Sequence, residues 1–434
     1  MPDTPAFDTP TSDPPPVGVS TAAPAKTGLT RRRFLAGGLA AGAVGAAGAV
    51  VARHLAAPAP AHHRGLSGAG TLVLVTLYGG NDGLNTVIPY EDGSYLGGRA
   101  QLGYQPNEVL PLADGLGLHP NLKGLKGLWE ARQLAIVRGV GYPNPNRSHF
   151  RSMDIWQSAA PDRAVGSGWL GRWLDTTSRD PLLGLAVGPT LPLALTGDKV
   201  LGGAVPVGNL RLPGTTALQQ GYASLERPGP LGPPLMAQVA ASGADLLRIQ
   251  HTLSDALAHV PANEGGATTN LEGTSGPNSL GTQLDLVSRS IRAGVPTRAY
   301  AASLGGFDTH ANEKATHARL MAEIDTALTG FLASLGGAAR GQGVVVLVHS
   351  EFGRRVAANA SGGTDHGTAA PVLALGPSVK GGFYGEEPSL TGLDQGDLKY
   401  TTDFRSVYAT VLDHVLGVDP AVSLGGKFAD VGFL

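Results

Sequence analysis

The sequence contains no cysteine among its 434 residues. This absence excludes disulfide bonds, cysteine-ligated zinc, iron–sulfur clusters, a cysteine nucleophile and a lipidated cysteine anchor. A chain without thiols also tolerates an oxidising compartment. The composition is therefore compatible with a protein that functions outside the cytoplasm.

The chain also lacks a strong charge of either sign. Its 32 Lys and Arg residues are balanced by 34 Asp and Glu residues, for a net charge of −2, and no long basic run follows the N-terminal region. Proteins that bind nucleic acid or an anionic membrane surface concentrate positive charge. We therefore expect no nucleic-acid partner, and a small-molecule or carbohydrate ligand instead.

A long hydrophobic run is missing as well. The stretch Leu35–Val51 contains only Ala, Gly, Val and Leu, but a spanning helix needs about 20 predominantly apolar residues. The stretch directly follows Thr30, three arginines (31–33) and Phe34, which is the pattern of a twin-arginine export signal. This pattern predicts the Tat translocase as a partner during export.

Small residues follow the apolar stretch, and we place signal cleavage after Ala61. Residues 1–61 are thus expected to be a disordered leader and signal peptide, and 62–434 a single domain without a stable membrane span. The mature chain would be secreted, periplasmic or at the cell surface. The alternative is an uncleaved membrane anchor.

What the chain has in abundance is Gly, with 64 residues, and Pro, with 32, which predicts many turns and loops. Between the loops, continuous apolar runs favour buried strands and apolar residues spaced by three and four favour helices. Strands are predicted at 71–78, 298–302, 343–349 and 371–375, and helices at 246–260, 280–291 and 321–335.

The β-α-β order of these elements predicts an α/β fold with a doubly wound, mostly parallel sheet, whose ligands bind at the carboxyl ends of the strands. Thr71–Tyr78 should be a central strand, parallel to the run at 343–349. The Gly- and Pro-punctuated stretch at about 177–280 is expected to be an irregular helical cap or insertion, with a polar loop at 265–277.

Polar side chains cluster after the predicted strands and on nearby loops. The clusters are Asn81-Asp82, Asn146 to His149, Asp308 to His310, and Ser350-Glu351 with Asp365-His366. Oxygen and imidazole donors gathered from several strand ends are what a two-metal hydrolytic site requires. Each cluster also has a structural interpretation: Asp82 as a turn former or helix N-cap, and His366 as a loop histidine satisfied by backbone groups.

Five motifs in order resemble a known family. They are Tyr78–Pro89, Arg147–Phe150, Gly306–His310, Ser350–Arg354 and Gly363–Gly367, with a later match at Thr401–Tyr408. The chain is similar, from about residue 71 to its C-terminus, to the family catalogued as domain of unknown function 1501. That family is a distant relative of alkaline phosphatases, sulfatases and cofactor-independent phosphoglycerate mutases, which have a doubly wound α/β sheet and two metals.

The resemblance implies roles for individual residues. Asp82 corresponds to a ligand of one metal, and Ser148 lies where a nucleophile could lie. The other metal would be held by a set of three: Asp308, His310 and His366.

The sequence departs from the superfamily pattern at the first metal. Glu351 and Phe352 stand where the superfamily usually has Asp and His, so that metal site is impaired or retuned. One or two divalent ions are expected, with zinc, manganese and calcium as candidates. Because there is no cysteine, formylglycine made from cysteine is excluded, and with it the usual sulfatase mechanism.

Two functions remain open at this point. The first is a metal-dependent hydrolase or transferase of phosphate- or sulfate-type esters, with Arg147 or Arg354 clamping the anion. The second is a non-catalytic secreted binding or assembly protein that retains the fold, because fold alone does not define function. Asp308, His310 and His366 should converge, and Asp82, Glu351 and Ser148 should border the same cleft; a His366 remote from Asp308 would favour the second function.

Overall fold

The computed structural model describes residues 70–99, 101–207, 220, 234–260, 279–336 and 341–434. The predicted signal peptide at 1–61 and the predicted loop at 265–277 lie outside these ranges. Within the described ranges, none of the helices combines the length and the apolar character needed to cross a membrane.

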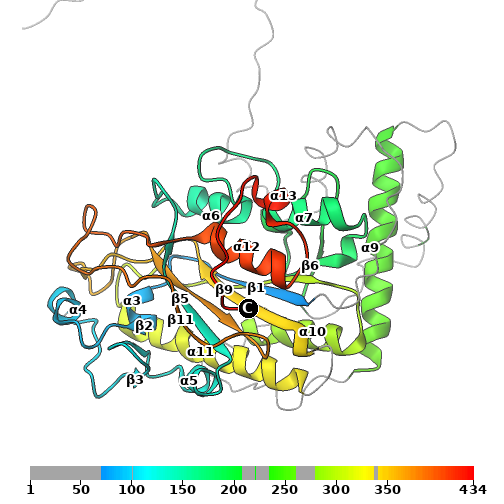
Figure 1. Cartoon of the computed structure of the whole chain (residues 1–434). Helices are drawn as coiled ribbons and strands as arrows, with labels where there is room; N and C mark the ends of the chain where they lie inside the picture. Colours follow the sequence, from blue (N-terminus) through cyan, green and yellow to red (C-terminus); the bar gives the residue numbers. More distant parts are fainter. Residues whose placement is uncertain (1–69, 100, 208–219, 221–233, 261–278, 337–340) are drawn as a thin grey trace, which may run out of the picture. The chain divides into compact units, whose positions relative to one another are not determined.

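The core of the described part is a nine-stranded, mostly parallel sheet (Figure 1). In spatial order its strands are β11 (Gly382–Tyr384), β5 (Leu134–Gly141), β10 (Ala370–Leu375), β9 (Val344–Ser350), β1 (Thr71–Leu77), β8 (Ala299–Leu304), β6 (Gly184–Val187) and β7 (Gly203–Val205), while β12 (Thr402–Asp403) pairs with β5.

Strand β1 lies at the centre of this sheet, as the sequence predicted. It pairs in parallel with β9, Val75 opposite Val348, and with β8, Val75 opposite Ala302. All its residues after Thr71 are buried. A strand covered on both faces needs apolar side chains at consecutive positions, and for this reason the sequence run predicted a buried strand.

Strand β10 is antiparallel to its two neighbours in the large sheet. It pairs antiparallel with both β9 and β5, whereas the other described pairings of the large sheet are parallel. The amino end of β10 therefore lies at the edge where its neighbours have their carboxyl ends. A loop that enters β10 thus reaches the same edge as the loops that leave β1, β8 and β9.

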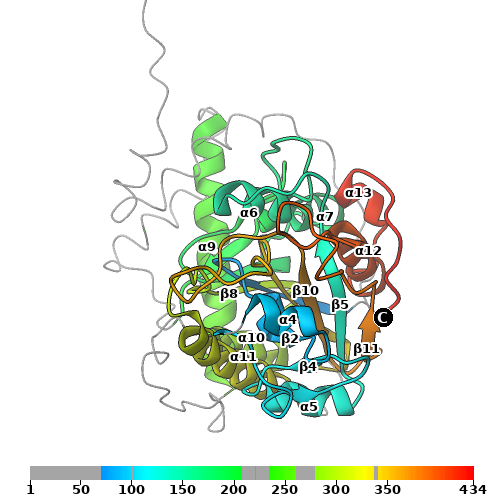
Figure 2. The ribbon, with the colours of Figure 1, turned by 90° about the vertical axis from the view of Figure 1, so that its left-hand side faces the viewer.

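Helices cover both faces of the sheet (Figures 1 and 2). One face carries α5 (Lys123–Glu130), α10 (Leu280–Ala293) and α11 (Glu313–Leu335), and the other carries α6 (His149–Ser158), α7 (Trp169–Thr177), α12 (Phe404–His414) and α13 (Pro420–Leu424). Two apolar clusters form, because alternate residues of β1 point to opposite faces: Val73 and Val75 join the first cluster, Leu72 and Leu74 the second.

Smaller elements complete the described structure. The long helix α9 (Pro234–Ala258) packs beside α10. The remaining elements are α3 (Gly83–Thr86), α4 (Gly93–Gly98), the three-stranded sheet β2 (Val87–Ile88), β4 (Gly117–Leu118) and β3 (Leu110–Pro111), and the 3-10 turns η1 (Pro181–Leu183), η2 (Leu193–Leu195) and η3 (Gly341–Gly343).

The sheet extends into the stretch where an insertion was expected. Strands β6 and β7 lie within 177–280 and form the parallel edge of the large sheet. They are only four and three residues long and are surrounded by Gly and Pro, so they lack the sustained apolar run that marks a central strand. The helix predicted at 246–260 corresponds to the C-terminal part of α9, which ends at Ala258.

Candidate metal centre

The loops at the carboxyl edge of the sheet bring distant polar residues together. Asp308 follows β8, Glu351 follows β9, and His149 begins α6 after β5. His366 precedes the antiparallel strand β10 and forms a bridge with Arg354. Open α/β sheets bind their ligands at this edge.

Two glycines let the backbone after β1 approach these loops closely. Gly79 and Gly80 have φ angles of +117° and +75°, which favour glycine. A Cβ at Gly79 would lie 2.4 Å from the backbone nitrogen of Asp308, and one at Gly80 would lie 2.3 Å from the Phe352 ring. No larger residue fits while these loops keep their places.

Three imidazoles are each anchored through Nδ1 to an oxygen acceptor. His149 Nδ1 lies 2.8 Å from Glu351 Oε1, and His366 Nδ1 lies 2.8 Å from the backbone oxygen of Arg147. His310 Nδ1 lies 3.4 Å from Asp365 Oδ1. A neutral ring that donates its Nδ1 proton keeps a lone pair on Nε2, which is the usual arrangement of a metal-binding histidine.

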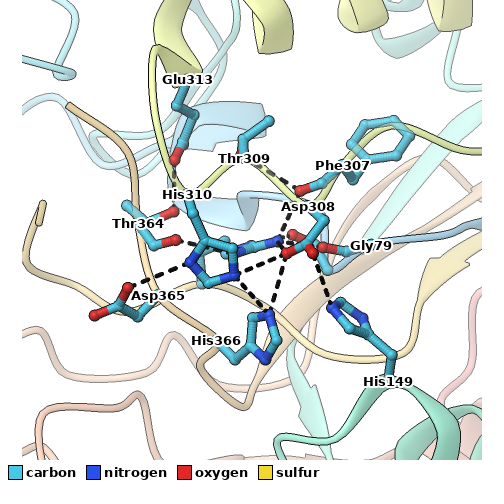
Figure 3. Close-up of polar contacts among 12 residues, drawn as sticks. Gly79, His149, Phe307, Asp308, Thr309, His310, Glu313, Thr364, Asp365 and His366 are labelled. Carbon is cyan, nitrogen blue, oxygen red and sulfur yellow. Dashed lines mark hydrogen bonds and ion pairs between the residues drawn. The ribbon is translucent and has the colours of Figure 1, made fainter. Parts of the chain in front are cut away.

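The three Nε2 atoms converge on the carboxylate of Asp308 (Figure 3). Asp308 Oδ1 lies 2.9 Å from His310 Nε2 and 3.1 Å from His366 Nε2, and Asp308 Oδ2 lies 3.4 Å from His149 Nε2. His149, Asp308 and His366 offer donor atoms that all lie within 4.8 Å of one another. Asp308, His310 and His366 therefore come together as the sequence predicted, while their role as ligands stays a prediction.

The close approach of two imidazole nitrogens is compatible with a cation between them. His310 Nε2 and His366 Nε2 are only 2.9 Å apart, and two lone pairs at that distance repel unless a proton or a cation lies between them. His149 Nε2 is shielded from solvent and has no hydrogen-bond partner among the described residues. A buried polar atom without a hydrogen bond is costly, so the chemistry of this nitrogen, 3.4 Å from Asp308 Oδ2, fits a metal ligand.

Asp308 is held in its charged form. Partial burial raises its pKa, but the hydrogen bond and charge of Arg354 and the neighbouring His366 side chain outweigh that effect and lower the pKa to about 2. Arg354 Nη2 donates to Asp308 Oδ1 at 2.8 Å. A carboxylate that stays ionised at neutral pH can accept a cation.

The donor spacing fits a small cation with nitrogen and oxygen ligands. Ligand atoms about 2.0–2.1 Å from a tetrahedral zinc lie about 3.3–3.4 Å from one another, near the 2.9–3.4 Å contacts of Asp308 with the three histidines. Imidazole-rich sets suit zinc and its transition-metal neighbours, whereas calcium prefers six to eight oxygens. The side chains of Asp308 and His310 are 49% and 46% exposed, so a substrate can reach the cluster.

Phe352 forms an apolar wall of the site. This buried ring lies 5.0 Å from the His149 ring and 4.9 Å from the His366 ring, between centroids. Phe352, which stands where the resemblance predicted a histidine, thus packs against two of the candidate ligands. It fixes their ring planes without supplying a donor.

The other predicted site residues lie around the cluster in different roles. Glu351 is buried and contacts His149, the Gly79 nitrogen and Ser350. Both oxygens of its carboxylate therefore already have hydrogen-bond partners within the protein. Ser148 is exposed, and its hydroxyl makes no cap hydrogen bond to α6.

Neither predicted arginine clamp presents a free guanidinium. Arg354 is buried and donates to the backbone oxygens of Gly79, Gly80, Phe307 and Thr364 as well as to Asp308. Arg147 forms an ion pair with Asp397. Arg354 therefore positions Asp308, and Arg147 holds His366 through its backbone oxygen.

Asp82 lies in a separate, buried cluster. Its Oδ2 pairs with Arg99 Nη1 at 2.5 Å, and neither side chain is exposed. Burial and the charge of Asp82 raise the pKa of Glu313, and Glu313 Oε2 accepts from Thr364 at 2.6 Å. The charge that a metal would neutralise at Asp82 is neutralised here by Arg99.

Sequence reasoning singled out the segment around His149 but not this histidine as a ligand. Ser148 and His149 are adjacent, and adjacent residues rarely form a nucleophile and its base. The missing signal was strand β5, whose apolar run Leu134–Val137 is broken by the polar Arg138. Recognising β5 would have placed His149 at the same sheet edge as Asp308.

The sheet and this cluster define an α/β protein with a candidate mononuclear metal centre at the carboxyl edge of its strands. The chain belongs to the family described as protein of unknown function (DUF1501), whose model matches residues 69–428. A search of curated protein sequences found no match.

Several solved structures are similar to the chain. A protein of the alkaline phosphatase superfamily from Vibrio parahaemolyticus is 11% identical, with 83% of this chain and 71% of that chain covered and a TM-score of 0.38. The phosphonate monoester hydrolase of Agrobacterium radiobacter is 12% identical, with 83% and 78% covered and a TM-score of 0.37. The C-terminal periplasmic domain of EcEptC from Escherichia coli is 10% identical, with 86% and 93% covered and a TM-score of 0.36.

Proposed function

We propose that the protein is a metal-dependent hydrolase or transferase of phosphate- or sulfate-type esters, with one divalent cation held by His149, Asp308, His310 and His366. The observation that carries this proposal is the convergence of three Nε2 atoms on one ionised carboxylate, each ring being anchored through Nδ1. A divalent cation bound there supplies Lewis-acid stabilisation of negative charge on the ester group.

The surrounding residues prepare this centre. Glu351 and the Arg147 carbonyl fix the tautomers of His149 and His366, and Arg354 keeps Asp308 ionised and oriented. These partners orient the donor atoms, an effect that in metal sites typically changes affinity by about 10- to 100-fold.

Ser148 is the nucleophile in this proposal. It is adjacent in sequence to the ligand His149, and its hydroxyl is exposed. Ser148 Oγ would form the new bond to phosphorus or sulfur while the bond to the leaving oxygen breaks, and the serine proton would pass to the departing alcohol. Water would then attack the covalent ester, the bond to Ser148 Oγ would break, and the serine oxygen would take up a proton from that water as the anion leaves.

A matched pair of variants tests the proposal. Wild type, His366→Ala and His414→Ala would be loaded with zinc or manganese, analysed for bound metal, and assayed on 4-nitrophenyl phosphate, phosphonate and sulfate. His414 is an exposed histidine that pairs with Asp430 away from the centre, so its removal controls for the loss of an imidazole. Hydrolysis by wild type and His414→Ala but not by His366→Ala supports the proposal. Full metal binding and activity in His366→Ala contradict it.

One observation favours a second candidate, a non-catalytic binding or assembly protein. Asp308 and three imidazoles offer four candidate donors, of which those of His149, Asp308 and His366 all lie within 4.8 Å of one another, and closed four-ligand sites are typical of structural metals. In that case metal removal would lower thermal stability and no ester in the panel would be turned over.

We also propose that the chain is exported by the twin-arginine translocase, on the evidence of Arg31 and Arg32 before the apolar stretch. Replacing both by Lys should leave the precursor in the cytoplasm, whereas Arg33→Lys should have a smaller effect. Cell fractionation measures this, and normal processing of the double variant would reject the signal assignment.

A further inference from the structure

A cavity of about 200 Å³ lies at the carboxyl ends of β1, β6 and β8, outside the metal centre. Leu74, Ala186 and Ala301 form its floor, and all three belong to the sheet face whose apolar cluster includes α6 and α7. The exposed Thr190 and the half-exposed Tyr78 lie in its wall.

The lining contains no charged side chain. Leu, Ala, Val and Pro side chains make up most of it, and the polar groups are two threonines, a serine, Tyr78 and Gln157. Ligand sites are typically apolar with a few placed polar groups. An uncharged, largely hydrocarbon group therefore fits this cavity, and an anion does not.

The cavity wall continues into the metal centre. Gln157 Nε2 donates to the Tyr78 hydroxyl at 3.3 Å. The next residue, Gly79, donates its backbone N–H to Glu351 Oε1 at 2.9 Å, and the same oxygen lies 2.8 Å from His149 Nδ1. The two sites thus share one wall, with Tyr78 at the boundary.

Helix α6 sets the distance between the two sites. His149 is its first residue, and Gln157 follows eight positions later in the same helix. At about 1.5 Å per residue the two lie about 12 Å apart along the axis. A ligand that fills the cavity while its ester group meets His149 must be extended.

On the basis of the proposed function, we propose that this cavity receives the hydrocarbon part of the substrate's alcohol, so that the preferred substrate is an extended alkyl or aryl ester. The volume suits roughly one aromatic ring or six to eight carbons, since an apolar cavity of about 150 Å³ holds benzene. In the overall reaction water adds to phosphorus or sulfur, the ester bond to the alcohol oxygen breaks, and that oxygen takes up a proton from the water. Short esters occupy the metal centre but leave the cavity empty.

The test is a series of n-alkyl phosphates from ethyl to dodecyl, assayed below their micelle concentrations with the metal-loaded, full-length protein. Once the chain is long enough to enter the cavity, each added methylene should raise kcat/KM by up to about fourfold, until the cavity is full. Thr190→Trp and Pro189→Trp place a large side chain at exposed lining positions. Both should abolish the gain for long chains without changing ethyl phosphate hydrolysis. Thr391→Trp, on another exposed loop, should behave as wild type.

Binding of 1-octanol, measured by displacement of an apolar fluorescent dye, provides a readout that needs neither metal nor turnover. Octanol binding that Thr190→Trp abolishes supports the cavity assignment even if no phosphate is hydrolysed, and that result would reject the proposed function alone. Hydrolysis that is independent of chain length, a length dependence that survives both tryptophan variants, or a preference for sugar phosphates would each overturn the assignment.

Discussion

Two aspartates follow neighbouring strands of the same sheet and end in opposite environments. Asp82, after β1, is buried with Arg99 and Glu313. Asp308, after β8, is half exposed and faces three imidazoles whose Nε2 atoms point toward it. The difference lies in the source of the positive charge: at Asp82 the chain supplies it, and at Asp308 the donor set leaves room for an external cation.

This comparison explains why the expectation of one or two ions becomes a one-metal proposal. A buried carboxylate needs a compensating charge, and Arg99 provides one while its other donors reach the backbone oxygens of Arg355 and Val356. The lowered pKa of Asp308 has a similar origin in Arg354. However, Arg354 contacts only Oδ1 of that carboxylate, an oxygen that it shares with His310 and His366, while Oδ2 faces His149.

The largest expected effect is on stability at the buried cluster. Arg99→Met should lower the free energy of unfolding by about 3–5 kcal/mol, because it leaves Asp82 buried without its partner. Asp308→Asn should cost less stability than Arg99→Met in metal-free protein, because Asp308 is half exposed and the buried Arg354 keeps four backbone oxygen acceptors. Urea denaturation measures both.

A double variant sharpens this prediction. Asp82→Asn combined with Arg99→Met should recover part of the loss, since no unpaired charge remains buried. If Arg99→Met alone were as stable as wild type, a group other than Arg99 would neutralise the charge of Asp82. The claim that the two aspartates differ in the source of their positive charge would then be wrong.

The next effect is on metal affinity. Glu351→Gln keeps the shape of the side chain that anchors His149 but removes its charge, and should weaken binding by about 10- to 100-fold. Asp365→Asn, whose contact with His310 is longer at 3.4 Å, should weaken it less. Competition titration with a zinc chelator measures the zinc dissociation constants of both variants. An unchanged affinity in Glu351→Gln would show that the Glu351 charge does not support metal binding.

Glu313 is expected to make the free energy of unfolding depend on pH. Burial, and then the charge of Asp82, raise its pKa above the usual value, so the folded state retains a proton that the unfolded chain loses near pH 4.5. This contribution is fully present at low pH and declines as the pH rises, by at most about 1.4 kcal/mol per unit.

Glu313→Gln cannot ionise, so its stability relative to wild type should increase between pH 5 and 8. Paired denaturation curves at several pH values test this. A constant difference across the range would mean that Glu313 is ionised in the folded protein.

The smallest structural effect is expected at Ser148. A serine that caps a helix usually contributes about 0.5–2 kcal/mol, but Ser148 makes no cap hydrogen bond. Ser148→Ala should therefore change stability by less than about 0.5 kcal/mol and leave bound metal unchanged, while ester turnover is lost. Full turnover in this variant would assign the attack to another nucleophile.

The central part of the fold was predictable, since β1 and β9 are buried on both faces and carry continuous apolar runs. Helices α10 and α11 show the matching spacing of three and four residues. The edge strands β6 and β7 were not predicted, because a run of three or four residues among Gly and Pro is too short to show a hydrophobic periodicity.

The candidate site was predictable only where strand ends marked it. Asp308, His310 and His366 stood out by residue type and position, but the ion pair of Asp82 with Arg99 joins residues 17 positions apart in a loop-rich segment. Nothing local in the sequence distinguishes an aspartate paired with a loop arginine from one that awaits a metal. His149 was missed as a ligand for a related reason, because its strand β5 is interrupted by Arg138.

Metal binding to the His149, Asp308, His310 and His366 cluster is the most direct test of this account. Isothermal titration of metal-free protein with zinc should give about one ion per chain for wild type and for His414→Ala, since the donors form a single centre. His149→Ala and His366→Ala should each lose this binding with the fold intact by circular dichroism. Zinc binding by both variants at wild-type affinity would show that these imidazoles are not ligands and would contradict the account.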